Sequence, residues 1–171
     1  MSAAIHIELD GVPGATKALK RAPDALMKEL TVAGVEAEML LTREVKENTP
    51  VGIMGGSGGL KGSTYGRTYT LGTSKVETKI GTPKQYAVPV EVGTKPHMPP
   101  VQPLIDWAIV KLGKSAKEAR GIGFAIALKI KAKGTEGQFM YHRAFKDNKD
   151  QVAGFYRAAV GRAAAILGKG A

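Results

Sequence analysis

The stretch from Gln85 to Thr94 places an apolar side chain at every second residue. That period is typical of a β-strand with one buried face. The apolar positions are Tyr86, Val88, Val90 and Val92. Pro89 lies within the run and cannot donate a hydrogen bond to a neighbouring strand, so we expect the strand at a sheet edge or at a bulge. An edge strand leaves backbone groups open to pair with another molecule. The pattern therefore predicts a surface for assembly.

Two shorter strands are predicted between Arg67 and Pro83, with a turn at Gly72-Thr73-Ser74. Together with Gln85–Thr94 they would form a three-stranded antiparallel meander. A further short strand is expected from Ile5 to Leu9, where apolar and polar residues also alternate.

The longest helix is predicted from Pro23 to Asn48. Its apolar residues recur every three or four positions, Pro23 suits the first helical position, and Thr49-Pro50 ends the pattern. An isolated hairpin is only marginally stable, so the meander needs this helix on its apolar face. The sequence thus predicts an α+β fold, with an antiparallel β-meander packed against a long N-terminal helix.

Further helices are expected in the C-terminal half, and they cover Pro103–Leu112, Ser115–Lys131 and Asp147–Leu167. The segment Gly134–Phe145 is expected to form a turn and a strand, with Phe139 and Tyr141 on one face. We expect a single domain over residues 1–171, in which residues 101–133 are a helical insertion.

Seven of the sixteen residues from Val51 to Gly66 are glycines, which predicts a flexible loop. A phosphate-binding loop must lie between a strand and a helix and end in Gly-Lys-Ser/Thr. This segment follows a helix, precedes a strand and lacks that ending. We therefore expect a loop that becomes ordered only against a neighbouring molecule.

The sequence AIVKLGKS, from Ala108 to Ser115, satisfies the loosest form of the phosphate-loop pattern. Its first half has helical spacing and no glycine, whereas phosphate binding needs a non-helical backbone whose N–H groups converge on the anion. A simpler interpretation is that Gly113 ends one helix while Ser115 and Glu118 form the capping box of the next.

The net positive charge of the chain is large and is unevenly distributed along the sequence. The net charge is +10, with eight acidic and six basic residues in positions 1–50 but five acidic and thirteen basic residues in positions 101–171. The basic half could bind nucleic acid. It could equally dock on the acidic half of a second copy, which is the head-to-tail contact that closes rings.

Composition limits the chemistry. The chain has no cysteine, so disulfides and thiolate metal sites are excluded. We expect no signal peptide and no membrane span, and hence a soluble protein made in the cytoplasm. His142 and Arg143 lack an accompanying nucleophile or carboxylate cluster, so we predict no catalytic, cofactor or metal site and no enzymatic activity. The cations Lys129, Lys131 and Lys133 either suit a helix C-terminus or face a polyanion.

Several segments together resemble a known family. They are Thr49-Pro50-Val51-Gly52, then Gly59-Leu60-Lys61 with Ser63, then Tyr86-Ala87 with Val90-Glu91-Val92-Gly93-Thr94, and finally Gly134-Thr135 before a terminal helix. Their order is similar to that of the tail-completion, or head-tail joining, proteins of long-tailed bacteriophages. The chain departs from the family pattern by an insertion at Ile53–Gly58 and by two helices in place of a proline-phenylalanine pair.

The resemblance implies a structural virion protein of the phage neck, made in the host cytoplasm. It would assemble as a ring, expected to be a hexamer, and dock on a tail terminator and a head connector, with genomic DNA in its lumen. Neighbouring copies would bury the Val51–Gly66 loop and the edge at Tyr86–Thr94. The expected interface residues are Tyr86, Val90, Glu91, Gly93, Thr94, Leu60 and Lys61. A basic nucleic-acid-binding module is the alternative function.

Overall fold

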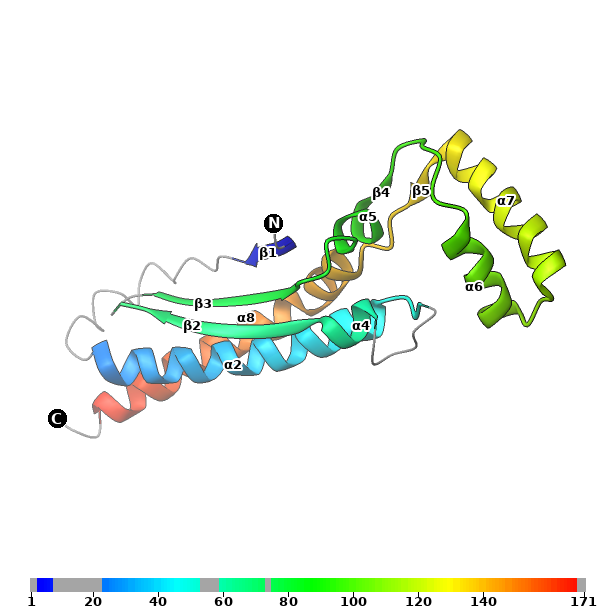
Figure 1. The fold of residues 1–171 in the computed structure, drawn as a ribbon. Coiled ribbons are helices and arrows are strands. Elements are labelled where there is room, and N and C mark those ends of the chain that lie inside the picture. Colours follow the sequence, from blue (N-terminus) through cyan, green and yellow to red (C-terminus); the bar gives the residue numbers. More distant parts are fainter. Residues whose placement is uncertain (1–2, 8–22, 53–58, 73–74, 169–171) are drawn as a thin grey trace.

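Two long helices and a small sheet form the elongated body of the molecule, and a pair of shorter helices projects from one end of it (Figure 1). The computed structural model describes residues 3–7, 23–52, 59–72 and 75–168. Helices and strands are both present, so the predicted α+β class is confirmed. No helix within these residues is long and apolar enough to cross a membrane.

Helix α2 spans Pro23–Asn48, as predicted. Its buried side is built from small and aliphatic residues spaced by three or four, among them Ala33, Ala37, Leu41 and Val45. At its end the Thr49 hydroxyl donates a 2.6 Å hydrogen bond to the Val45 carbonyl, and Pro50 follows. The helix therefore ends before Pro50, which has no backbone N–H to donate to a carbonyl of the preceding turn.

The sheet contains β1 (Ala3–Ile7), β2 (Tyr65–Leu71) and β3 (Lys75–Thr82) in the antiparallel order β1-β3-β2. The predicted hairpin of β2 and β3 is confirmed, with Thr68 opposite Thr78. The third strand is β1, which pairs Ile5 with Ile80. Helix α2 lies against the sheet so closely that a Cβ atom at Gly34 would come 2.7 Å from Thr68 Cγ2.

The strand predicted at Gln85–Thr94 is wrong. Residues Ala87–Val92 form the short helix α5, and only Gly93–Thr94 (β4) are extended. An apolar residue at every second position also places pairs four apart, which share one side of a helix. Pro89 fits because it lies in the first turn, where a backbone N–H has no helical partner to lose. The helix buries Ala87 and Glu91.

The predicted glycine-rich loop is only partly irregular. Its second half forms the four-residue helix α4 (Leu60–Ser63) and the beginning of β2. Residues 53–58 lie outside the described part of the chain, so the expected ordering of this loop against a neighbour stays a prediction.

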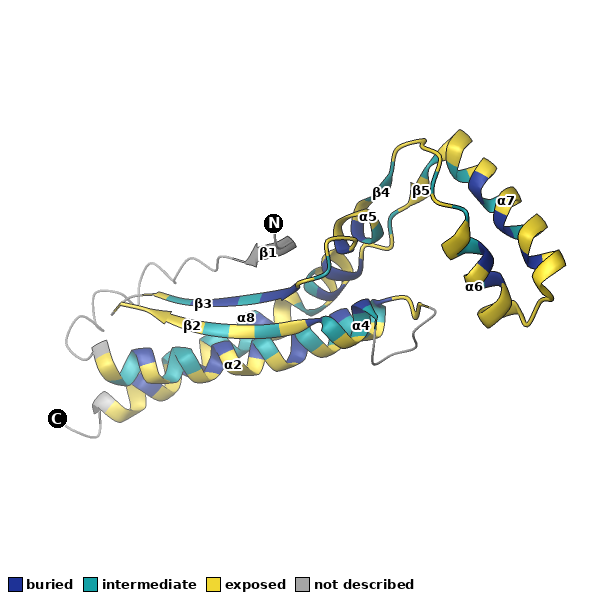
Figure 2. Ribbon diagram, in the orientation of Figure 1, coloured by how far each residue is buried: buried dark blue, intermediate teal, exposed yellow. Residues whose placement is uncertain are grey.

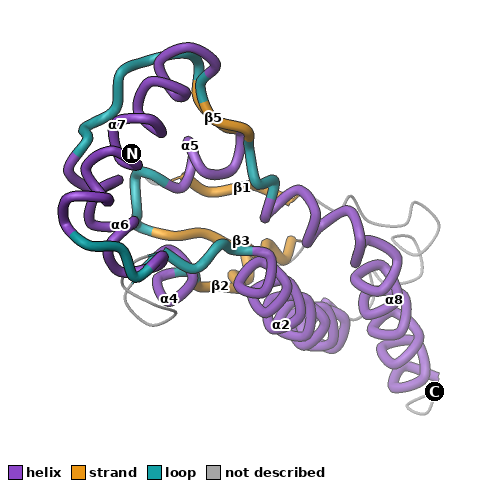
Figure 3. The backbone as a smooth tube through the Cα atoms, turned by 90° about the vertical axis from the view of Figure 1, so that its right-hand side faces the viewer, coloured by secondary structure: helices purple, strands orange, loops and turns teal. Residues whose placement is uncertain are grey.

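Helix α8 spans Met140–Gly168 and begins seven residues before the predicted start at Asp147. The strand predicted within Gly134–Phe145, with Phe139 and Tyr141 on one face, is wrong, because only β5 (Thr135–Glu136) is extended and Tyr141 already belongs to α8. β5 pairs with β4, so that Thr94 lies opposite Thr135. Helix α8 then runs back along the body antiparallel to α2 (Figures 1 and 3).

One core joins the two long helices to the sheet. Dark blue positions of α2, α8 and β3 in Figure 2 meet along the inside of the body. Met140 and Val152 of α8 are almost completely buried there, together with Leu41 of α2 and Ile80 of β3. These contacts bury apolar area along most of the length of the body and stabilise the two-layer arrangement.

The projecting unit consists of α6 (Gln102–Leu112) and α7 (Ala116–Lys133), close to the predicted bounds. We refer to residues 102–133 as the arm. The arm has its own small core of Ile105, Ala108 and Ala119, with Trp107 packed against it. The antiparallel pair β4–β5 connects it to the body (Figure 1). The arm is thus a satellite cluster with a separate set of apolar contacts.

Candidate functional site

Two of the segments that carry the family resemblance, Tyr86–Thr94 and Gly134-Thr135, meet where the arm joins the body. We refer to residues 86–94 and 134–142 as the joint. Its central residue is Glu91, whose carboxylate accepts two hydrogen bonds of 3.0 Å, from the backbone N–H groups of Tyr141 and His142. These groups belong to the first turn of α8, where N–H groups lack helical partners and a negative charge is favourable. Glu91 is buried. It therefore caps α8 from a segment fifty residues away.

Backbone contacts hold the other side of the joint. Phe139 N donates to the Glu91 carbonyl at 2.9 Å, and the hydroxyls of Thr94 and Thr135 are 2.9 Å apart. Gly93 has φ +80°, and a Cβ atom there would overlap the Thr135 carbonyl oxygen. The Gly-Thr pairs at 93 and 134 thus let two chain segments approach at backbone distance.

The surface of the joint carries several exposed apolar side chains. Four large side chains there are between 47% and 61% exposed, and we refer to them as the joint patch: Tyr86, Val88, Val92 and Phe139. Val88 and Val92 lie one helical turn apart on α5. Phe139 has φ +50°, a conformation that is uncommon for a bulky residue and is often found at functional positions.

The predicted interface residues have different surroundings. Tyr86 is exposed and belongs to the joint patch. Leu60 is buried in the main core, and Val90 packs against that core. Lys61, Gly93 and Thr94 are partly exposed. Leu60 and Glu91 therefore stabilise the chain itself, and the assembly role predicted for all seven residues stays a prediction.

Sequence reasoning missed Val88, Val92 and Phe139 as a group. Val88 and Val92 were visible as apolar residues, but the strand prediction assigned both to a face shared with Val90. Phe139 was expected beside Tyr141, whereas the structure exposes Phe139 and buries Tyr141. Burial raises the pKa of the Tyr141 phenol, although Thr64 lies close enough to oppose part of that increase. No sequence signal marks the backbone conformation that separates these two rings.

The three lysines predicted to face a polyanion do not form one cluster. Lys129, Lys131 and Lys133 are all exposed near the end of α7. Residues four apart share a side of a helix, whereas residues two apart point to nearly opposite sides. Lys129 and Lys133 therefore face one direction and Lys131 another.

The segment that resembles a phosphate loop has the predicted capping geometry. Residues 108–112 are helical, and Gly113 is left-handed with φ +62° and ψ +29°. Ser115 and Glu118 form a reciprocal capping box. Hydrogen bonds from Ser115 to the Glu118 carboxylate hold the pKa of that group below its usual value. The hydroxyl and backbone of Ser115 are thus already engaged in beginning α7.

Metal-ligand chemistry has no candidate in the described ranges, where no group of three or more histidine, cysteine, aspartate or glutamate side chains could hold an ion. His142 lies at the joint surface, where its ring meets the edge of Phe139 at a centroid distance of 6.4 Å. The features that remain for function are the joint patch and the basic arm. Comparisons with protein-family models, curated proteins and solved structures found no match for this chain.

Proposed function

We propose that this chain is a structural protein of the phage neck, which assembles as a ring that completes the tail end and joins it to the head connector. The observation that carries the proposal is the joint patch, because four large apolar side chains are exposed in the segments where the arm meets the body. Large apolar side chains exposed in one region of a surface are typical of protein–protein contacts.

The position of the patch supports an assembly role. Two of the segments that resemble the tail-completion family build the joint, and Glu91 and Gly93 give it a fixed backbone. A rigid support is what a contact surface needs, since less side-chain and backbone freedom is then lost on binding. In this proposal the joint patch binds a neighbouring copy, a tail terminator or a head connector, and genomic DNA passes through the ring.

The proposal is tested by replacing Tyr86 with alanine and Val88 with serine in the phage that encodes the chain. Both side chains are exposed, so the purified variant should retain the wild-type circular dichroism and melting temperature. We expect filled heads and finished tails that fail to join, counted by electron microscopy.

The matched control is Ile166→Ser, which removes an equally exposed apolar side chain near the far end of α8. It should leave the yield of complete particles unchanged. Normal numbers of joined particles in the Tyr86/Val88 variant would contradict the proposal, as would side-chain-resolution images of virions in which the neck contains no copy of this chain.

A basic nucleic-acid-binding module is the second candidate, and the charge of the arm favours it. Residues 102–133 contain seven lysine or arginine residues and two acidic residues. Binding through phosphate contacts weakens steeply as salt increases. Fluorescence anisotropy with DNA duplexes of several sequences, from 50 to 300 mM salt, would support this function if affinity differed strongly between sequences as well as falling with salt.

A further inference from the structure

Helix α7 carries two different stripes along its length. The inner stripe consists of small buried residues, Ala119, Gly123 and Ala127, and a Cβ atom at Gly123 would come 2.7 Å from Ile105 Cγ1 of α6. The outer stripe contains Phe124 and Leu128, which are 54% and 58% exposed. They lie one turn apart and so form a continuous apolar surface that α6 does not cover.

Cations extend the outer stripe in both directions. Lys117, Arg120 and Lys131 continue it at steps of three or four residues, and all three are exposed. We refer to these five residues, Lys117, Arg120, Phe124, Leu128 and Lys131, as the arm stripe. Its apolar centre favours a protein partner over DNA, because phosphate contacts use cations and gain nothing from two large hydrocarbon side chains. Its cations favour a partner that is acidic.

Helix α2 offers a surface of that kind. Val32, Val35 and Met39 are spaced by three and four residues on its outer side and are 43%, 43% and 70% exposed. The exposed carboxylate of Glu36 lies within one turn of both Val32 and Met39. We refer to these four residues as the α2 stripe.

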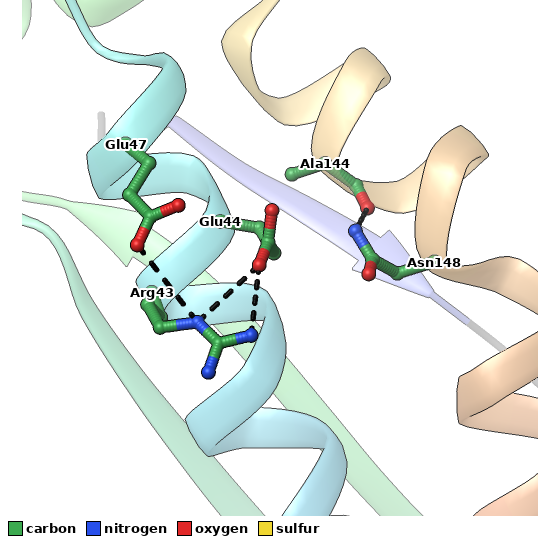
Figure 4. Close-up of polar contacts among 5 residues, drawn as sticks. All are labelled: Arg43, Glu44, Glu47, Ala144 and Asn148. Atoms are coloured by element: carbon green, nitrogen blue, oxygen red, sulfur yellow. Dashed lines mark hydrogen bonds and ion pairs between the residues drawn. The ribbon is translucent and has the colours of Figure 1, made fainter.

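The surrounding charge on α2 is complementary to that of the arm. Residues 23–48 contain six acidic and three basic residues. Arg43 is already bound along the helix, by Glu44 at 2.9 Å and by Glu47 at 3.9 Å (Figure 4). Glu29 is likewise paired, with Arg162 of α8. Glu36 takes part in none of these pairs, and its exposed side chain can meet an incoming cation.

We propose that the arm stripe of one copy packs on the α2 stripe of the next copy, with Arg120 near Glu36. The arm projects away from the body (Figure 1), so it does not reach α2 of its own chain. The two surfaces differ, and the contact is therefore head-to-tail, which closes a ring when the rotation between copies allows it. This inference rests on the ring of the proposed function and names one of its contacts.

Disulfide cross-linking tests the contact directly, because the chain has no cysteine. Met39→Cys protein is mixed with size-tagged Leu128→Cys protein and oxidised, over concentrations up to the solubility limit. We expect a heterodimer on a non-reducing gel. The matched control pairs tagged Leu128→Cys with Ile166→Cys, which is also about half exposed but lies near the end of α8. That pair should give little heterodimer, and equal yields from both pairs would overturn the inference.

A charge exchange tests the polar part of the contact. Arg120→Glu should lower the yield of the Met39–Leu128 cross-link several-fold, because it places two carboxylates together. Adding Glu36→Lys to the Met39→Cys partner should restore the yield. If Arg120→Glu weakens DNA binding and leaves the cross-link unchanged, the arm binds a polyanion and the inference is wrong.

The two proposals fail separately. The cross-link is measured on purified protein, so its absence at every concentration overturns the arm–α2 contact and leaves the neck assignment to the particle images. If the specific cross-link forms but virions contain no copy of the chain, the arm–α2 contact is supported and the neck function is wrong.

Discussion

A single carboxylate fixes where the arm leaves the body. Glu91 binds two N–H groups of the first turn of α8 while its own carbonyl accepts a hydrogen bond from Phe139. The residue comes from α5, so it couples a short helix to the beginning of the longest one. The family resemblance identified Glu91 as an interface residue, and the structure gives it a role in the fold.

Replacing Glu91 with alanine should therefore destabilise the protein by about 2 kcal/mol, because two N–H groups in the first turn of α8 lose their acceptor. Urea denaturation followed by circular dichroism measures this change. Glu136→Ala is the control, since Glu136 is an exposed acid on the neighbouring strand β5. If both variants are as stable as the wild type, the carboxylate does not cap α8.

Gly93 supports a second prediction at this scale. A side chain there would have to adopt φ +80° and would overlap the Thr135 carbonyl oxygen, so Gly93→Ala should cost about 3 kcal/mol. Gly72 also has a positive φ, of +62°, but has open space around it. Gly72→Ala should cost only about 1 kcal/mol. Similar melting temperatures for the two variants would contradict the close approach of β4 and β5.

The helices and strands differ in how well their sequence predicted them. In some elements the apolar residues recur with the period of a helix or of a strand, but not with both. The sequence predicted these elements, which are α2, the hairpin of β2 and β3, and the two arm helices. The apolar residues of α5 fit both a strand and a helix. Val88 and Val92 are four residues apart, a spacing that places them on one face of a strand and also on one side of a helix. Helix α8 begins at Met140, before the predicted start at Asp147, because Glu91 caps it. No residue near Met140 in the sequence predicts that contact.

Two glycines of α7 provide a prediction for the arm. Gly121 is exposed with nothing near its Cβ position, so Gly121→Ala should stabilise the arm by roughly 0.5 to 1 kcal/mol through helix propensity. Gly123 contacts Ile105, so Gly123→Ala should push α6 and α7 apart and destabilise the arm.

Trp107 reports on these two variants. It is the only tryptophan in the chain and packs in the arm core, so its fluorescence follows the arm, while circular dichroism is dominated by the body. The fluorescence midpoint in urea should rise for Gly121→Ala and fall for Gly123→Ala. A shift of the same sign in both variants would show that Gly123 is not a contact between the helices.

At the scale of the whole molecule, body and arm have separate cores. The body buries side chains of α2, α8 and β3, and the arm buries Ile105, Ala108 and Ala119. The two strands of the joint connect them. A projecting unit with its own core can reach a neighbouring molecule without disturbing the fold that carries it, which suits an assembly role.

Removing the arm should therefore leave the body folded. Residues 95–134 would be replaced by Asn-Gly, a two-residue turn that suits the antiparallel pair of Thr94 and Thr135. We expect a cooperative thermal transition by circular dichroism, and no self-association in sedimentation velocity if the arm stripe carries the contact between copies. An unfolded product would contradict the independence of the two cores.

The sequence by itself determined the α+β class, the bounds of α2, the β2–β3 hairpin and the capping box of α7, because each depends on residues that are close together in the sequence. Tertiary structure decided the rest. It placed β1 as the third strand and converted a valine-rich run into α5. It also began α8 at Met140 through a carboxylate fifty residues away. These outcomes depend on contacts between distant segments, which local periodicity does not encode.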